Sequence, residues 1–354
     1  TSEGHYKFIS HENFEFELGG SINPLEIVYE TYGELSPEHD NVILIHHALS
    51  PSHHVASHSE EDKPGWWENM VGPGKPIDSH KYFVICIGNI GSCYGSSSPL
   101  SIDPKTKKPY RANFPTLTMN DIVHSQKILL DCLKIKNFHA IIGNSVGAML
   151  SLIWGILYPD TMKYLVLTSS SYKAYPANIA NRVVQREVIQ LDPEYQNGFY
   201  ETNPTNGLKI ARKLGHFTYR NPADLNQKFS NNHKIAPNLP CEVENYLEYN
   251  ATKFATQFDA NCYLYLLTAM DLFDVTRDYE KPLEVFKKIQ AKTLVISVDS
   301  DILFTPQQQA ELFQCLKDAG AHAHLIQHHS SYGHDTFLVE TDVIGKYIVD
   351  FLSQ

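Results

Sequence analysis

The sequence lacks two features that would point to a membrane or a nucleic acid. It has no apolar run approaching the length of a membrane span and no basic-then-apolar segment typical of a secretion signal. Basic residues are also in deficit, because 29 Lys and Arg stand against 40 Asp and Glu, for a net charge of -11 at pH 7. A general nucleic-acid binder needs a positive surface to displace counterions. We therefore expect neither a membrane nor a nucleic-acid partner. An anionic small substrate stays possible, because a few basic groups can serve a pocket.

Paired cysteines are lacking as well. The six cysteines include no Cys-x-x-Cys spacing, and most of them lie in apolar segments. They are Cys86, Cys93, Cys132, Cys241, Cys262 and Cys315. This usage predicts buried free thiols and a reducing, cytoplasmic location.

The sequence does contain short apolar runs that alternate with helical patterns. Continuous apolar runs of the kind found in strands buried on both faces occupy residues 41–46, 82–87, 140–143, 164–169 and 293–298. A helical pattern follows a cap at Thr118 or Asn120, and residues 146–157 are apolar nearly all round. Strands alternating with helices predict an α/β fold with a mostly parallel sheet flanked by helices.

Two regions depart from this alternation of predicted strands and helices. Near the N-terminus, residues 13–18 and 25–33 have β-type patterns and predict a starting hairpin or meander. Between the fourth and fifth apolar runs the segments are amphipathic, tyrosine-rich and helical. We therefore predict three parts: residues 1–169 as the first part of the core, 170–290 as an inserted helical lid, and 291–354 as the second part of the core.

Ser145 stands in a Gly-x-Ser-x-Gly sequence between a predicted strand and a predicted helix. In the nucleophile elbow of α/β hydrolases a serine occupies a strained turn of this kind, and glycines such as Gly143 and Gly147 relieve the crowding. The helix N-terminus would aim the Val146 N–H at a developing oxyanion, and the loop after residues 41–46 would supply Leu49 N–H as the second donor. The alternative is a purely structural turn.

A serine nucleophile needs a base and an acid, which in this fold follow it in the order acid, then histidine. Asp299 and Asp301 both come just after the last long apolar run, and either could orient an imidazole. His334 lies in a loop after a later β-type run, while His328 and His329 compete for the same role from positions closer to the strand.

A separate group of histidines begins at the end of the first apolar run, residues 41–46. No cysteine or carboxylate spacing completes a zinc pattern with them, so we interpret the group as a polar loop at the mouth of the pocket and predict no metal. Its members are His46, His47, His53, His54 and His58.

At this point several long segments together resemble the homoserine O-acetyltransferase family of methionine biosynthesis. The similarity runs from about Ile27 to the C-terminus. Its main segments are "GWWENMVGPGKPIDSHKYFVIC", "GNSVGAMLSLIWGILYPD", "GLKIARKLGHFTYR", "FDANCYLYLLTAMDLFDV", "SVDSDILFTPQQQ" and "YGHDTF". The resemblance implies an α/β-hydrolase-fold acyltransferase with a helical lid that forms a cytoplasmic homodimer through that lid.

The resemblance also implies the chemistry. An acetyl group would pass from acetyl-CoA, a co-substrate rather than a bound cofactor, to the hydroxyl of L-homoserine by a ping-pong mechanism. The family's catalytic triad falls on Ser145, Asp301 and His334. Its amino-acid-binding positions fall on Arg212 and Asp335, with Tyr219 as a weaker match. A guanidinium could grip the carboxylate of homoserine, and an aspartate its ammonium.

The sequence also departs from the family. Asn144, Ala148 and Leu150 replace a Gly, a Gly and a Gln at the elbow, and residues 50–52 read Ser-Pro-Ser instead of Thr-Gly-Ser. We expect these positions to line the acyl end of the pocket, so succinyl transfer or a serine acceptor stays open. A lidded serine esterase with the same triad and a non-catalytic binding module are the other hypotheses.

Overall fold

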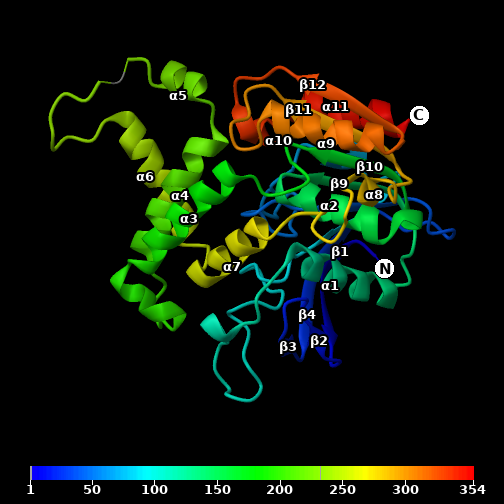
Figure 1. The fold of residues 1–354 in the computed structure, drawn as a ribbon, viewed down its shortest axis with the longest axis horizontal. Coiled ribbons are helices and arrows are strands. Elements are labelled where there is room, and N and C mark those ends of the chain that lie inside the picture. Colours follow the sequence, from blue (N-terminus) through cyan, green and yellow to red (C-terminus); the bar gives the residue numbers. More distant parts are fainter. Residues whose placement is uncertain (1, 232) are drawn as a thin grey trace.

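The computed structural model describes residues 2–231 and 233–354 and is built on one eight-stranded sheet (Figure 1). The strand order is β1-β4-β8-β5-β9-β10-β11-β12. In that order the bounds are Gly4–Ser10, Leu25–Tyr32, Phe83–Ile87, Val42–His46, Phe138–Asn144, Met162–Thr168, Lys292–Val298 and Ala323–His328. The strands from β8 to β12 pair in parallel, whereas β4 pairs antiparallel with both β1 and β8. The sequence prediction of an α/β fold with a mostly parallel sheet is confirmed.

The apolar runs become the central strands, as predicted. Every residue of β5 and β8 is buried, because helices and loops cover both faces of the sheet. One face packs against α1 (Met119–Cys132), α2 (Val146–Leu157), α8 (Leu283–Phe286) and α9 (Pro306–Asp318), and the other packs against α11 (Thr341–Leu352). Thr118 caps α1 through a reciprocal capping box, which confirms one of its two predicted start positions.

The N-terminal region differs in part from the prediction. The segment 13–18 contributes only β2 (Phe14–Glu15), which pairs with β3 (Ser21–Ile22) in a small separate sheet. The strand β4 lies where a strand was expected, but its antiparallel partner is β1, which the pattern analysis did not identify. A second small sheet joins β6 (Val71–Gly72) to β7 (Ile77–Asp78).

Between β10 and β11 the described residues form helices, joined by loops and one isolated β-bridge. These are α3 (Pro176–Gln190), α4 (Thr205–Tyr219), α5 (Pro222–Lys228), α6 (Glu242–Ala255), α7 (Ala260–Asp271) and α8. Figure 1 shows α3 to α6 projecting from the sheet, with α7 leading back toward it. We call α3 to α6 the lid. The stretch 243–271, continuous in the sequence pattern, divides into two helices because Asp259 caps a new one, accepting from Cys262 N–H.

All six cysteines are free thiols, but only Cys86 and Cys262 are buried. Cys132 is exposed because it ends α1 on the side that faces away from the core. The expectation of buried thiols is therefore correct for two residues and wrong for Cys132. Among the described residues, no helix combines the length and the apolar character needed to cross a membrane.

Candidate active site

Ser145 occupies a strained turn between β9 and α2, with φ 56° and ψ -120°. Such a conformation is unfavourable for a residue with a side chain and persists only where the surroundings enforce it. The neighbours do so by close approach. A Cβ on Gly147 would lie 2.0 Å from the carbonyl oxygen of His46, and one on Gly143 would lie 2.1 Å from that of Gly147. The two glycines let the helix start directly against the sheet, which lifts the Ser145 side chain off the end of β9.

His334 and Asp301 complete a hydrogen-bonded chain with this serine. The Nε2 atom of His334 lies 2.8 Å from Ser145 Oγ, and its Nδ1 lies 2.8 Å from Asp301 Oδ2. The other carboxylate oxygen of Asp301 accepts from the backbone N–H groups of Leu303 and Phe304, each at 2.9 Å. The carboxylate is thus fixed by its own loop, and a carboxylate, an imidazole and a hydroxyl stand in line, as nucleophilic catalysis by a serine would need.

The electrostatics of His334 suit a base. Burial lowers the pKa of this imidazole, but the charge and hydrogen bond of Asp301 and the charge of Asp335 outweigh the burial. The pKa of His334 is therefore raised above its ordinary value. The side chain is 4% exposed, so its partners rather than water set its orientation.

The competing acid and histidines form other pairs. Asp299 accepts from His329 Nδ1 at 2.7 Å in an exposed pair at the surface. His328 Nε2 lies 2.7 Å from Glu340 and its Nδ1 lies 3.2 Å from Tyr347 Oη. Neither histidine contacts Ser145, so of the alternatives left open by spacing only Asp301 and His334 reach the serine.

Leu49 and Val146 are the two predicted oxyanion donors. Leu49 lines the same pocket as Ser145, and Val146 is the first residue of α2. Within the described chain, neither backbone N–H donates a hydrogen bond to another protein group. The loop before Leu49 is held by His47, whose Nδ1 lies 2.8 Å from Ala48 O and whose Nε2 accepts from Asn89 N–H at 3.1 Å.

The histidine group does not form the predicted polar loop at the pocket mouth. His46 and His47 are buried, at 0% and 1% exposure, and burial lowers the pKa of His46 to about 3 and that of His47 to about 4. His46 bridges Ser151 and Gln126 behind the elbow. The remaining three, His53, His54 and His58, surround Glu30 of β4 instead. Sequence spacing could not find that carboxylate, because the fold brings it from an earlier strand.

Ser145 and His334 open into a pocket of about 160 Å³ between the core and the lid. Apolar side chains from α7 (Tyr263, Leu267 and Met270) form one wall at helical spacing. Leu49 and Leu303 come from core loops. A cavity with a mostly apolar lining and a few charged groups is the usual form of a small-molecule site.

Arg212, Asp335 and Tyr219, the predicted substrate-binding residues, all line this pocket. The Arg212 guanidinium stacks on Phe254 at 4.3 Å and on Tyr219 at 5.0 Å, and its buried Nε has no hydrogen-bond partner among the described residues. Asp335 makes no hydrogen bond or ion pair within the described chain. Burial raises the pKa of Asp335, against the opposing charges of His334, Arg220 and Arg212. The Arg212 side chain makes one long hydrogen bond, from Nη1 to Tyr219 Oη at 3.4 Å, and no ion pair within the described chain. A cation without an acidic partner and a carboxylate without a hydrogen-bond partner therefore face one cavity.

The pattern analysis missed a polar face of the lid that also lines the pocket. Asn181, Arg182 and Gln185 of α3 contribute to the lining, as does His216 of α4. Arg182 is ion-paired with Asp271, leaving one buried guanidinium nitrogen without a partner. The only available signal was the position of 181, 182 and 185 on one face of a predicted amphipathic helix, which is equally typical of a solvated face.

The elbow substitutions do not line the pocket as expected. Asn144, Ala148 and Leu150 are packed inside the core, each no more than 1% exposed, because Asn144 ends the buried strand β9 and the other two lie within the buried helix α2. Ser50 and Pro51 do line the pocket beside Leu49. Only the loop departure therefore bears on the ligand.

The sheet, the elbow and the lid define an α/β hydrolase, and the family model for the alpha/beta hydrolase fold matches residues 41–341. A homoserine O-acetyltransferase of Deferribacter desulfuricans is 41% identical, with 97% of this chain and 93% of the relative covered. A homoserine O-succinyltransferase of Janthinobacterium sp. is 42% identical, with 92% and 87% covered.

Two solved structures share the whole architecture. The crystal structure of homoserine O-acetyltransferase from Bacillus anthracis is 27% identical with a TM-score of 0.93, over 99% of this chain and 98% of that one. The structure of esterase E22 is 28% identical with a TM-score of 0.92, over 99% and 100%. The chain belongs to the homoserine O-acyltransferase family, whose members include both acetyl- and succinyltransferases.

Proposed function

We propose that this protein transfers an acetyl group from acetyl-CoA to the hydroxyl of L-homoserine through an acyl-Ser145 intermediate. The observation that carries the proposal is that the Ser145–His334–Asp301 chain opens into the same pocket as Arg212 and Asp335, neither of which has an ion-pair partner among the described residues. The product, an O-acylated homoserine, fits the methionine biosynthesis that the family resemblance implies.

In the first half-reaction, His334 Nε2 takes the Ser145 proton while Oγ attacks the thioester carbonyl. The developing oxyanion would accept hydrogen bonds from the Leu49 and Val146 N–H groups. When the tetrahedral intermediate collapses, the carbon–sulfur bond breaks and His334 returns its proton to the departing thiolate. The acyl group stays on Ser145 as an ester.

In the second half-reaction, the acceptor hydroxyl takes the place of CoA. His334 removes the proton of the hydroxyl, the alkoxide attacks the acyl-serine, and collapse returns the proton to Ser145 Oγ. Hydrolysis of the acyl-enzyme competes with this step. The lid helices and the apolar wall from α7 limit the access of water to the ester.

Arg212 and Asp335 are suited to hold the two charged ends of homoserine. The guanidinium would bind the carboxylate in a bidentate manner, while stacking on Phe254 and Tyr219 keeps it in place. The Asp335 carboxylate would bind the ammonium, and this pairing would offset the cost of its burial. Asp335 follows His334 directly, so the bound amino acid would have its hydroxyl near the imidazole.

The charges in the pocket support acetyl rather than succinyl as the donor group. A succinyl carboxylate needs a second free cation. Among the described lining residues, Arg182 is already paired with Asp271, and Arg212 is assigned to the acceptor. Burial, with the charges of Arg212 and Arg220, lowers the pKa of His216 to about 4, so this imidazole is neutral near pH 7. Acetyl needs only apolar surface such as that of Leu49 and Leu303.

The similarity to esterase E22 makes hydrolysis the second candidate, because the same triad serves both reactions. The deciding experiment measures thiol release from acetyl-CoA and from succinyl-CoA, each with and without L-homoserine or L-serine. Ser145→Ala serves as the control. We expect sustained release only with acetyl-CoA and homoserine together. Equal release without any acceptor would mean a hydrolase and would overturn the proposal.

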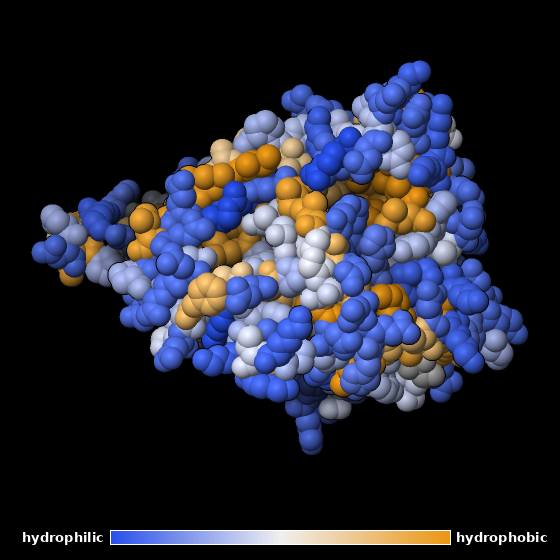
Figure 2. Space-filling view, turned by 60° about the horizontal axis from the view of Figure 1, so that its bottom comes forward, coloured by the Kyte–Doolittle hydropathy of each residue, from blue (hydrophilic) through white to orange (hydrophobic). Residues whose placement is uncertain are grey.

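We also propose that two copies associate through the lid. Four side chains of α3, α4 and α6 (Val184, Ile210, Phe217 and Tyr249) are large, apolar or aromatic, and exposed. Figure 2 shows apolar side chains interleaved with hydrophilic ones over the narrow extension of the molecule. Several large apolar side chains gathered on one projecting part of the molecule support its use as an interaction surface.

A further inference from the structure

Outside the active site, one buried carboxylate is surrounded by four imidazoles. Glu30 of β4, with 6% of its side chain exposed, is contacted by His5, His53, His54 and His58. His5 is its direct antiparallel neighbour on β1, and the other three belong to the loop between β5 and β6. We call these five residues the Glu30 cluster. None of them lines the pocket of Ser145.

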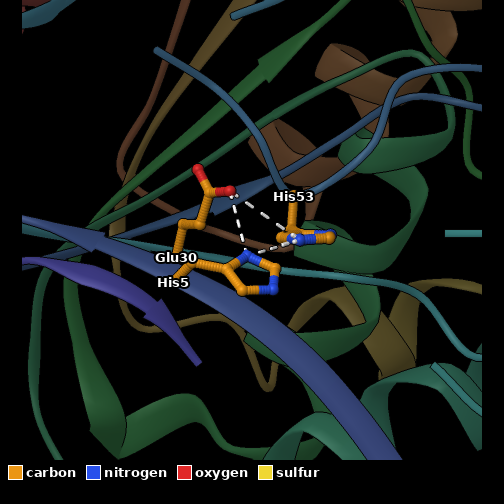
Figure 3. A group of neighbouring side chains, drawn as sticks. All are labelled: His5, Glu30 and His53. Atoms are coloured by element: carbon orange, nitrogen blue, oxygen red, sulfur yellow. Dashed lines mark hydrogen bonds and ion pairs between the residues drawn. The ribbon is translucent and has the colours of Figure 1, made fainter. Parts of the chain in front are cut away.

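The cluster contains two triads that share the carboxylate, one on each oxygen. On Oε1, His5 Nδ1 lies at 3.2 Å and His53 Nε2 at 3.8 Å, and the two nitrogens are 3.2 Å apart (Figure 3). Bond lengths of about 2.0–2.1 Å in a tetrahedral site imply ligand–ligand distances of about 3.3–3.4 Å. The spacing suits a metal, but one proton on His5 Nδ1 also satisfies this triad as a hydrogen bond to Glu30.

In the second triad, Glu30, His54 and His58, a single proton does not provide a donor for every hydrogen-bond contact. Glu30 Oε2 lies 2.9 Å from His54 Nδ1 and 3.2 Å from His58 Nε2. The outer nitrogens of these rings contact groups that only accept: His54 Nε2 lies 2.7 Å from Lys63 O, and His58 Nδ1 lies 3.3 Å from a Glu3 carboxylate oxygen. A neutral imidazole has one N–H, so in each ring one of the two nitrogens must face an acceptor with a lone pair.

When the N–H of each ring points outward to Lys63 O or Glu3, the inner nitrogens of His54 and His58 present lone pairs to Glu30 Oε2. When it points inward, the outer nitrogens face these acceptors with lone pairs instead. Acceptors on both sides of each ring favour added positive charge, either as an extra proton on each ring or as a cation between the inner nitrogens and the carboxylate. A metal-binding histidine usually directs one nitrogen at the metal and donates its N–H to an acceptor on the other side of the ring. His54 and His58 can both do this, with the Glu30 carboxylate as the third ligand.

Tyr32 preorganises this triad. Its hydroxyl donates to Glu30 Oε2 at 2.6 Å, and its ring stacks on that of His58 with centroids 4.6 Å apart and an angle of 6°. Tyr32 lies two residues from Glu30 on β4, so a rigid strand holds the carboxylate together with the residue that orients it. The side chains of His54 and His58 are 23% and 22% exposed, which leaves a path for an ion and its water.

We propose that Glu30, His54 and His58 bind one divalent transition-metal ion of the zinc class, with water completing the coordination. Nitrogen and carboxylate ligands of this kind suit Zn²⁺ better than Ca²⁺ or Mg²⁺, which require mainly oxygen. The ion would tie β4 to the loop that continues from Leu49, Ser50 and Pro51 of the pocket. Its role would therefore be structural, holding that loop to the sheet.

The test is Zn²⁺ binding to chelator-treated full-length protein, measured by calorimetry and by metal analysis after dialysis. We expect one ion per chain, a thermal unfolding midpoint that rises with Zn²⁺, and an affinity at least about tenfold lower in His54→Ala and His58→Gln. His80→Ala, which removes an exposed histidine elsewhere, is the matched control and should bind like the wild type.

Each alternative result has a defined meaning. Absence of stoichiometric binding to the wild type would overturn the proposal and leave protonated imidazoles as the source of charge. Binding lost in His5→Ala but retained in His54→Ala would overturn the assignment to the second triad, and two ions per chain would overturn the single site. Because His58 is near the surface, its glutamine variant tests the site even where Glu30→Gln does not fold.

Discussion

The imidazole of His334 lies 2.8 Å from the hydroxyl of Ser145, although 189 positions separate the two residues in the chain. The contact forms because β9 and β11 both end at the same edge of the sheet and the loop after β12 returns to that edge. In an open parallel sheet the carboxyl ends of the strands define the binding crevice, so residues that follow different strands can meet there.

Asp301, the acid of the hydrogen-bonded chain that ends at Ser145, gives the first prediction. We expect Asp301→Asn to lower kcat by about 10³–10⁴-fold, because an amide no longer holds the imidazole in the productive tautomer or stabilises its charge. Asp299→Asn is the matched control, since Asp299 pairs with the exposed His329 and should leave kcat within about twofold of the wild type. Thiol release under saturating substrates measures both. Equal losses in the two variants would contradict the assignment of the acid.

The raised pKa of His334 predicts a particular pH dependence. The base must be neutral to accept the serine proton, so kcat/KM should fall as the pH drops through the pKa of His334. Since Asp301 raises that pKa, the acidic limb should lie above the ordinary histidine value of about 6.5. In Asp301→Asn the residual activity should show the limb at lower pH. A wild-type limb well below pH 6.5 would count against His334 as the titrating group.

Arg212 provides a test of the acceptor site. We expect Arg212→Ala to lower kcat/KM for homoserine by about 10²-fold, equivalent to about 2.7 kcal/mol for a lost charged hydrogen-bond pair. Formation of the acyl-enzyme, followed as a burst of thiol without acceptor, should persist. Lys213→Ala is the control, because this neighbour pairs with Glu248 and does not line the pocket. Unchanged transfer in Arg212→Ala would remove the acceptor assignment.

Much of the core could be predicted from the sequence because burial on both faces leaves a local signature. Every residue of β5 and β8 is buried, and all are apolar except His46 at the end of β5. The elbow combines an apolar strand, two glycines and a helix within a few residues. The strand β1 leaves no such signature. Its residues alternate between exposed and half-buried, so its identity depends on pairing with β4, which local pattern does not encode.

The residues of the candidate site also differ in how far the sequence alone could predict them. Spacing alone left Asp299 and Asp301 equivalent, because both follow β11 by a few residues. The resemblance favoured Asp301, and the fold separates them physically, burying one and exposing the other. The Glu30 cluster and the α3 face with Arg182 could not be predicted, since each depends on contacts between segments far apart in the sequence.

Gly147 gives a prediction about the stability of the elbow. A Cβ at this position would overlap the carbonyl oxygen of His46, which belongs to a central strand and cannot move freely. We expect Gly147→Ala to lower the free energy of unfolding by more than about 2 kcal/mol. In Gly155→Ala, on the same helix, the nearest atom is a side-chain methyl at 3.2 Å, so the change should stay within about 1 kcal/mol. Urea denaturation followed by circular dichroism compares the two, and equal midpoints would contradict the steric argument.

The exposed apolar surface of the lid predicts the oligomeric state. Val184 and Phe217 are 46% and 51% exposed on helices that pack against each other, and a stable dimer buries about 1,200–2,000 Å² of such surface in total. Light scattering should therefore give the wild type about twice the chain mass of 40.2 kDa. A charge introduced by Val184→Asp or Phe217→Asp should shift the mass to that of one chain, because an unpaired buried carboxylate is costly at an interface. Leu18→Asp, which adds the same charge to an exposed site on the core, should leave the dimer intact. A wild type that is monomeric at micromolar concentration would show that the lid surface serves another purpose than self-association.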